Sequence, residues 1–205
     1  MWLKSRSPYN ISANVKVKKA IELLLLPGTD VAFSQAGLSL YLSGTMSALG
    51  QADNLVKINA FASDNSNYSG AIIYEQGNNL KSQFDYTELN YLNVYYDYED
   101  SWQRQSFLVP LQLNNSKLNL LTYEWNANFY IKAVTNSSIH LLGGGSSGNS
   151  SSSRVNSLEN VVVTSSGFGA EGEPLDNVVN GLYSQNITNS IFTNISLFTE
   201  NGSID

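Results

Sequence analysis

Short stretches of alternating apolar and polar residues run through the first two thirds of the chain. In the segment 14–18, for example, Val15 and Val17 share one side and Asn14, Lys16 and Lys18 share the other. A period of two is the pattern of a β-strand with one buried side. The same pattern, or a short apolar run closed by Gly or Pro, predicts further strands at 21–26, 39–42, 55–61, 71–74, 89–98, 107–113 and 138–142.

The longest alternating stretch is residues 121–131. Eleven residues with a period of two predict a half-buried strand. The side chains that we expect to face the core are Leu121, Tyr123, Trp125, Phe129 and Ile131. The strand at 107–113 contains Pro110, which lacks the N–H donor of a ladder, so we expect that strand to lie at an edge or to carry a bulge.

About eight strands without a clear helix favour an all-β fold, and we expect an eight-stranded antiparallel β-sandwich of the jelly-roll type. The composition agrees with a folded β protein. Of the 205 residues, 42% are hydrophobic, only 14% are charged, and 12 are tyrosine. A chain with this much apolar and aromatic surface is not typical of disorder.

Four regions follow from the pattern. We expect a basic N-terminal arm that includes the first strand at 1–19, the sandwich at 20–142, a Gly/Ser-rich linker at 143–154 and an acidic extension for subunit contacts at 155–205. Within the extension, the spacing of Ile187, Ile191, Ile195 and Phe198 fits a helix and that of Ile191, Thr193, Ile195 and Leu197 fits a strand. The sequence leaves these two alternatives open.

Charge is distributed unevenly along the chain. Residues 1–19 have a net charge of +5 and the other residues a net charge of −11. The basic residues of the arm are Lys4, Arg6, Lys16, Lys18 and Lys19. Such an arm can attach to a nucleic acid, an anionic membrane surface or an acidic neighbour, and the alternative is a solvated terminus without a partner.

The sequence offers little that points to catalysis or to a cofactor. Residues 143–148 match the spacing GxGxxG, but serines rather than a helix follow, as expected of a linker. The single histidine, His140, has no second ligand for a His-based metal site, and the chain has no cysteine. We therefore expect no catalytic, cofactor or metal site and no enzyme activity.

One segment, residues 84–102, concentrates aromatic and acidic residues. We expect Tyr95, Tyr96, Tyr98 and Trp102 to contact a partner or to stack on a sugar, since aromatic rings beside polar groups suit carbohydrates. The acidic residues Asp97, Glu99 and Asp100 have the oxygen ligands that Ca²⁺ prefers, but they lack the spacing of an EF-hand loop. The alternative is an aromatic strand that runs into a solvated acidic turn.

In organisation, with a basic arm, a sandwich and a hinged tail, the chain resembles capsid or vertex proteins of tailless icosahedral viruses of hot-spring archaea. The resemblance implies a virion structural protein that assembles with copies of itself and other capsid proteins, its basic arm facing an internal membrane or the genome. The alternative is a carbohydrate-binding β-sandwich, a lectin or adhesin module at an extracellular surface. A shell protein assembles into particles, whereas a lectin is retained by a glycan.

Overall fold

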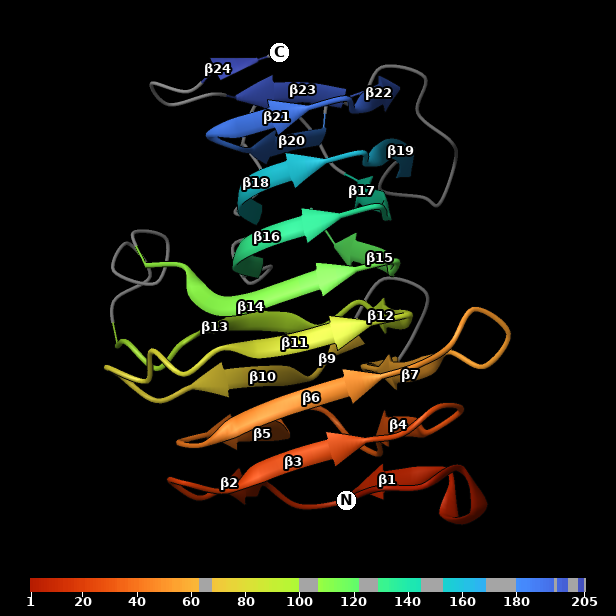
Figure 1. Ribbon diagram of the computed structural model, residues 1–205, viewed down its shortest axis with the longest axis vertical. Coiled ribbons are helices and arrows are strands. Elements are labelled where there is room, and N and C mark those ends of the chain that lie inside the picture. Colours follow the sequence, from red (N-terminus) through yellow and green to blue (C-terminus); the bar gives the residue numbers. More distant parts are fainter. Residues whose placement is uncertain are drawn as a thin grey trace.

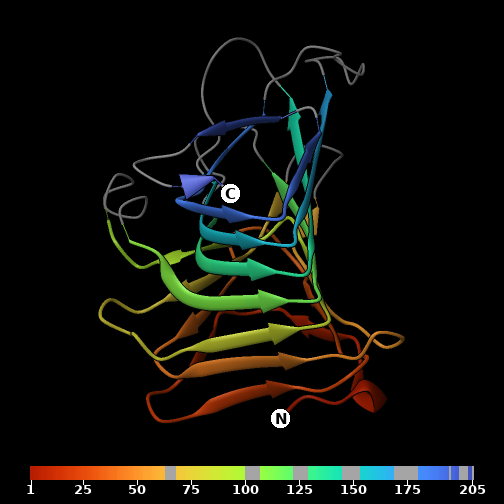
Figure 2. The ribbon, with the colours of Figure 1, turned by 45° about the horizontal axis from the view of Figure 1, so that its top comes forward.

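The chain folds as a parallel β-solenoid, in which the backbone winds through three faces in turn and each coil stacks on the previous one (Figure 1). A coil here means one passage through the three faces. The computed structural model describes residues 1–62, 68–99, 107–121, 129–144, 153–168, 180–193, 195–198 and 203–204. Figure 2 shows the same stack with its C-terminal coils turned forward.

The first face is an eight-stranded parallel sheet in which spatial order follows chain order. Its strands are β1 (Tyr9–Ile11), β4 (Asp30–Phe33), β7 (Val56–Asn59), β12 (Thr87–Asn90), β15 (Lys117–Leu121), β17 (Ser138–Gly144), β19 (Val162–Phe168) and β22 (Ile191–Thr193). Tyr9 lies beside Val31, and Val31 lies beside Ile58. Pairing partners are therefore one whole coil apart in the sequence.

The second and third faces belong to one fourteen-stranded sheet, because β16 (Phe129–Thr135) and β18 (Ser153–Glu159) each pair with strands of both faces. The second face also holds β2 (Val15–Val17), β5 (Ser39–Leu42), β10 (Ala71–Tyr74), β13 (Asn93–Tyr96), β20 (Asn180–Tyr183) and β23 (Ile195–Phe198). The third face also holds β3 (Glu22–Leu25), β6 (Thr45–Leu49), β11 (Ser82–Asp85), β14 (Val109–Asn114), β21 (Asn186–Thr188) and β24 (Ser203–Ile204). Outside these faces lie the 3-10 helix η1 (Lys4–Arg6) and a small antiparallel pair, β8 (Phe61–Ala62) and β9 (Tyr68–Ser69).

The expected antiparallel jelly-roll sandwich is wrong. Every ladder of the two large sheets is parallel, so consecutive strands do not form hairpins but turn a corner onto the next face. Alternation along a strand reports that one of its sides is buried and says nothing about the strand beside it. A sandwich and a solenoid therefore give the same local pattern. The pattern was read as a sandwich, whereas the fold is a solenoid.

Many of the strands themselves were predicted well. Residues 39–42 and 71–74 form β5 and β10 with the expected bounds. Pro110 lies in β14, which pairs with strands on both sides, and the register between β14 and β16 shifts between Val109 and Gln112. The expected irregularity at Pro110 is confirmed, in an interior strand rather than at an edge.

The segment 121–131 is less regular than its pattern indicates. Residues 122–128, including Tyr123 and Trp125, lie outside the described residues. Phe129 and Ile131 are buried as expected, but Tyr130 between them is also only 1% exposed. Both sides of β16 are therefore covered at its start.

The two ends of the chain also contribute strands to the solenoid. Residues 1–19 supply β1 and β2, in which Ile11 and Val17 are buried. The described residues of the range 155–205 supply strands, including β21, β22 and β23 over the segment for which a helix was the other alternative, and Val163, Leu182 and Ile187 are buried. Of the expected linker, Gly143 and Gly144 belong to β17, Ser153 and Arg154 begin β18, and residues 145–152 lie outside the described part.

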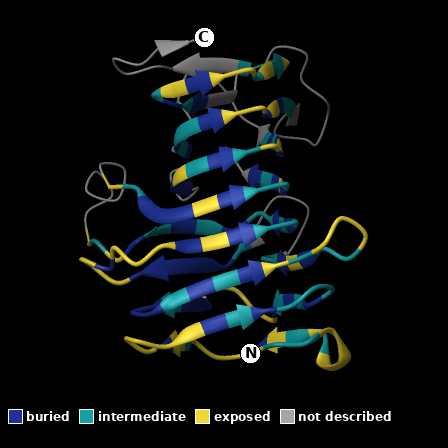
Figure 3. Ribbon diagram, viewed as in Figure 1, coloured by how far each residue is buried: buried dark blue, intermediate teal, exposed yellow. Residues whose placement is uncertain are grey.

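The core is a stack of apolar rows, one residue from each coil. On the first face the row consists of Tyr9, Val31, Ile58, Leu89, Leu118, Ile139, Val163 and Phe192. Its six middle members are at most 1% exposed. Along each strand, buried and exposed positions alternate, as Figure 3 shows for the strands of the third face. A coil has no core of its own, so its stability comes from its neighbours.

A repeated turn connects the third face to the first. Asn115, Asn136, Asn160 and Asn189 each lie two residues before a first-face strand and have φ between 47° and 53°. Asparagine tolerates this left-handed region better than most residues because its short side chain bonds locally. We call this turn the asparagine corner.

Candidate functional site

Outward amide side chains stack along the first face. Asn59 donates from Nδ2 to Asp30 Oδ1 at 2.8 Å, Asn90 donates to Asn59 Oδ1 at 2.7 Å, and Asn119 donates to Asn90 Oδ1 at 2.6 Å. The amides of Asn59 and Asn90 both donate and accept, as in a ladder of identical side chains on successive strands. The ladder joins four coils, which is a structural role.

A second ladder follows the asparagine corner. Asn115 donates to Asp85 Oδ1 at 3.0 Å, and Asn136 donates to Asn114 Oδ1 at the same distance. Asn160 then donates to Asn136 Oδ1 at 3.1 Å. Polar side chains of this corner are thus used to hold one coil to the next.

His140 belongs to the same outward surface of the first face. It lies between Asn119 and Thr164 in the pairing register. Its Nδ1 is 3.0 Å from Thr164 Oγ1, and its Nε2 is 2.9 Å from Ser166 Oγ. With both ring nitrogens bonded to hydroxyl groups of the next coil, the imidazole links two coils.

The corner between the second and third faces is different, and we call it the aromatic corner. Its connections are residues 18–21, 43–44, 75–81 and 97–108 in the first four coils, and β16 and β18 pass this corner as continuous strands. The two longest connections are therefore next to each other, between β10 and β11 and between β13 and β14. Insertions that leave the stack intact gather where a scaffold carries a function.

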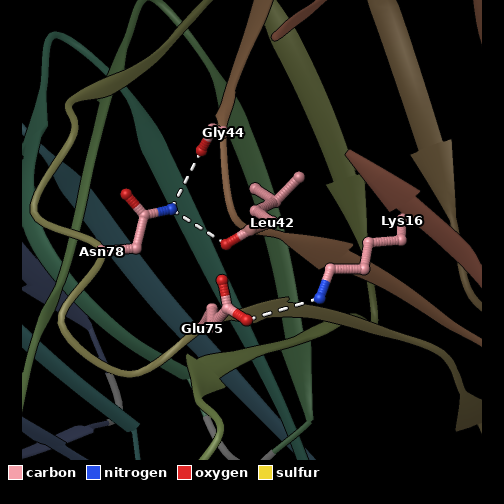
Figure 4. A network of polar contacts seen from close by, with 5 residues as sticks. All are labelled: Lys16, Leu42, Gly44, Glu75 and Asn78. Atoms are coloured by element: carbon pink, nitrogen blue, oxygen red, sulfur yellow. Dashed lines mark hydrogen bonds and ion pairs between the residues drawn. The ribbon is translucent and has the colours of Figure 1, made fainter. Parts of the chain in front are cut away.

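A buried asparagine fixes the first of these connections. Asn78 donates from Nδ2 to the carbonyl oxygens of Leu42 and Gly44, each at 2.9 Å (Figure 4). Its Oδ1 accepts from the N–H of Leu80 at 3.2 Å. A Cβ atom on Gly44 would come within 2.1 Å of the Ile21 carbonyl oxygen, so the connections of successive coils pack closely here.

An ion pair lies at the start of the same connection. Lys16 Nζ is 3.3 Å from Glu75 Oε1, and both side chains are more than half exposed. The hydroxyl of Ser43 and the ammonium of Lys16 hold the pKa of Glu75 below its usual range.

Four aromatic rings lead from the core to the surface at this corner. Tyr74 and Tyr96 meet edge to face with ring centres 6.2 Å apart, and Tyr96 and Tyr98 meet edge to face at 6.0 Å. Tyr98 then stacks on Phe107, with ring centres 5.1 Å apart and planes 25° apart. Tyr74 is fully buried, whereas Phe107 is 48% exposed.

The inner rings are held in place and remain uncharged. Tyr96 donates from its hydroxyl to the Asn78 carbonyl oxygen at 2.9 Å. Burial raises the pKa of Tyr74 and of Tyr96 because the phenolate is poorly solvated there. The outer Tyr98–Phe107 pair is thus built on a rigid base.

The structure divides the four aromatic residues that the sequence singled out. Tyr96 and Tyr98 belong to the line of rings, and Tyr95 lies on the opposite side of β13, beside Ile73 in the outward register. Trp102 lies outside the described residues. The sequence pattern does not single out Phe107: it predicts Phe107 as the start of a strand, whereas the residue precedes β14 by two positions.

Acidic residues flank Tyr98 in the sequence. Asp97 and Glu99, on either side of Tyr98 in the sequence, are exposed, and the carbonyl oxygen of Asp97 accepts from Gln76 Nε2 at 2.6 Å. Asp100 lies outside the described residues. Within the described part of the chain, no three His, Asp or Glu side chains cluster closely enough to hold a metal ion.

The predicted basic residues lie on the first coil. Lys4 and Arg6 belong to η1, where Lys4 donates to Asn54 Oδ1 at 3.1 Å. Lys16 points outward from β2, and Lys18 and Lys19 are exposed in the connection that follows it. These side chains are a feature of one end of the stack.

Comparisons with known proteins give no relative from which to transfer a role: no family model, no curated protein and no solved structure matches this chain. In the described residues, no helix has the length and apolar character needed to cross a membrane.

Proposed function

We propose that this protein is a non-catalytic carbohydrate-binding β-solenoid that binds a neutral glycan at its aromatic corner. The observation that carries the proposal is the stacked Tyr98–Phe107 pair in the longest connection of the aromatic corner, where the exposed residues Asp97 and Glu99 flank Tyr98 in the sequence. The role suits an extracellular surface, where a rod can present such a site.

The chemistry of a sugar ring matches this arrangement. One side of a hexose carries C–H groups that pack on an aromatic face, and its edge carries hydroxyls that need hydrogen-bond partners. One face of Phe107 is stacked on Tyr98, and 48% of the residue is exposed to contact a ligand. Asp97 and Glu99 supply acceptors for hydroxyl groups.

The charge of the connection that carries the outer pair favours neutral sugars. Residues 97–108 contain three acidic residues, Asp97, Glu99 and Asp100, and one basic residue, Arg104. The lysines of this corner, Lys18, Lys19 and Lys81, belong to the connections of the first and third coils. A uronic or sialic acid would bring a further negative charge close to these carboxylates, which costs free energy. A neutral hexose meets no such repulsion.

The virion interpretation loses its basis in this fold. It was built on a sandwich with a hinged tail, and the tail contributes strands of the same solenoid. The glycan-binding interpretation was built on the aromatic segment, part of which comes together at one corner.

Native gel electrophoresis through immobilised polysaccharide tests the proposal. We expect a neutral galactan or glucan to retard the protein and the acidic polymer polygalacturonate to leave its mobility unchanged. Phe107→Ala should weaken the retardation about fivefold, since a stacking contact of this kind is worth about 1 kcal/mol. Phe107→Trp should restore it because the aromatic face returns.

A matched control is Leu80→Ala, which removes another side chain that is 48% exposed at the same corner but has no aromatic face. Its retardation should equal that of the unchanged protein. Retardation by polygalacturonate alone, by none of the three polymers, or equally before and after Phe107→Ala would each overturn the proposal.

A further inference from the structure

Two tyrosines and an isoleucine form an outward row on the second face. Tyr41 of β5, Ile73 of β10 and Tyr95 of β13 are partners in the parallel register. The residues before and after each of them in the sequence belong to the core: Leu40, Leu42, Ile72, Tyr74, Val94 and Tyr96. Because consecutive strand residues point to opposite sides, the row points away from the core. We call Tyr41, Ile73 and Tyr95 the tyrosine strip.

The strip presents aromatic side chains at two positions. Tyr41 and Tyr95 are both half-buried, whereas Ile73 between them is only 5% exposed. Neighbouring strands of a sheet are about 4.8 Å apart, so the backbones of the two tyrosines are about 10 Å apart. A single sugar ring does not span that distance, but an oligosaccharide does.

Two exposed carboxylates border the strip on the side of the aromatic corner. The Glu75 N–H donates to the Leu42 carbonyl oxygen at 3.0 Å. The Asp97 N–H donates to the Tyr74 carbonyl oxygen at 2.8 Å, so both ladders continue for one residue beyond the strands. Glu75 and Asp97 each follow a residue of the strip by two positions and therefore lie on the same outward side, where they accept hydrogen bonds from hydroxyl groups.

A hydrogen-bond donor lies at the same border. Lys16 is the register partner of Tyr41, and its Nζ is 3.3 Å from Glu75 Oε1, two coils farther along the stack (Figure 4). The ion pair therefore passes the coil of Tyr41 and places an ammonium group beside a carboxylate. Sugar hydroxyls both donate and accept, so a neutral chain finds both kinds of partner along this border.

The strip is close in the chain to the site at the aromatic corner. Asp97 borders the strip, and Tyr98 of the stacked pair follows it directly. The side chain of Gln76 donates to the Asp97 carbonyl oxygen at 2.6 Å and so fixes the two long connections to each other. The two aromatic surfaces are therefore neighbours in the fourth coil.

From the outward tyrosines, the polar border and their continuity with the aromatic corner, we propose that the glycan is an extended chain, bound across coils from the Tyr98–Phe107 pair along the tyrosine strip to Tyr41. This inference rests on the proposed function, because it lengthens the same site. It makes the protein a binder of internal segments of a neutral polysaccharide rather than of single sugars.

Titration calorimetry of the whole protein with neutral gluco- and galacto-oligosaccharides of three and six units tests the extended site. The six-unit chain should bind at least about fivefold more tightly than the three-unit chain, because it reaches a further aromatic side chain. Tyr41→Ala should remove that gain and leave the affinity for the three-unit chain unchanged, whereas Tyr41→Phe, which keeps the ring, should retain the gain. Tyr95→Ala, at the other end of the strip, should also weaken binding of the six-unit chain, so the test does not depend on the folding of one variant.

The matched control is Tyr86→Ala, which removes another half-buried tyrosine in the connection between β11 and β12, away from the strip. It should bind both chains like the unchanged protein. Equal affinity for the two lengths, an unchanged gain in Tyr41→Ala, or the same loss in Tyr86→Ala would overturn the extended site while leaving binding at Phe107 in place. Absence of binding to either length in both sugar series would overturn the proposed function and this inference with it.

Discussion

The asparagine corner and the aromatic corner are both turns between neighbouring faces of one solenoid, but they are built on opposite principles. At the asparagine corner, residues of the same type recur with the same backbone conformation, and the side chains of Asn136 and Asn160 each bond to an asparagine one coil away. At the aromatic corner, no two of the described connections in the first four coils have the same length, and the side chains point out toward solvent or in toward the core.

The difference separates stability from recognition. A repeated hydrogen-bonded turn holds each coil on the next, and any coil that lacks it weakens the stack. A connection that varies can change without disturbing the ladders on either side of it. We therefore expect substitutions at the asparagine corner to change the free energy of unfolding, and substitutions at the outer aromatic corner to change binding.

The largest change in the free energy of unfolding is expected for a substitution in the core of the third face, which lies between the two corners. Phe84 of β11 is fully buried, so Phe84→Ala should lower the free energy of unfolding by about 3–5 kcal/mol through lost packing and a cavity. Gln83→Ala, one residue away on the exposed side, should change it by less than about 0.5 kcal/mol. Urea unfolding measures both, and similar losses would mean that the alternation of β11 is not as described.

The next largest change in the free energy of unfolding is expected at the asparagine corner, where two substitutions of Asn136 separate the backbone conformation from the side-chain bonds. Asn136→Ala places a Cβ-bearing residue without local hydrogen bonds at φ 47° and should cost about 1–2 kcal/mol. Asn136→Gly loses the same side chain but accepts the backbone conformation, so it should cost clearly less. Equal losses for the two variants would assign the effect to the side-chain ladder alone.

The stability at alkaline pH is expected to depend on Tyr74, the most buried of the four aromatic rings at the aromatic corner. The pKa of Tyr74 is raised by burial, so the folded state keeps its proton at a pH where the unfolded chain, with a pKa of about 10, loses it. Its contribution is complete below pH 10 and is lost as the pH rises above the unfolded-state pKa, by about 1 kcal/mol between pH 8 and pH 11. Tyr74→Phe should show that much less alkaline destabilisation in urea unfolding; an equal decline in both proteins would contradict a buried, neutral Tyr74.

The smallest effect is expected for the exposed ion pair. Glu75→Gln removes the contact with Lys16, and both side chains are more than half exposed. Water and salt screen such a pair, so the loss of stability should be smaller than for the other three variants and should vanish at high salt. A larger loss in thermal or urea unfolding would show that the aromatic corner also stabilises the stack.

The sequence predicted the strands but not their partners. Alternation located β5 and β10, and Pro110 indicated the irregularity in β14. The parallel stack was hidden because its repeat is short: an asparagine, often followed by serine, then an apolar residue three positions on, as in Asn115, Asn136 and Asn189. Connections of different length at the other corners make the spacing of these asparagines unequal, so no fixed period appears.

The candidate site was predicted only in part, because the sequence indicates strands but not which residues they bring together. Composition singled out the tyrosines around Tyr96, but consecutive strand residues point to opposite sides, so Tyr95 and Tyr96 could not share one platform. Phe107 joins Tyr98 only because a long connection returns to the same corner. That contact depends on the path of the chain in space, which a single sequence does not contain.

The most direct test of this account measures stability and glycan retardation on the same two variants. Asn136→Ala should lower the urea midpoint and, at temperatures where it is folded, bind the neutral polysaccharide as the unchanged protein does. Phe107→Ala should keep the urea midpoint and lose the retardation. If Phe107→Ala instead destabilises the fold, or if Asn136→Ala leaves the midpoint unchanged, the division between a structural corner and a binding corner is contradicted.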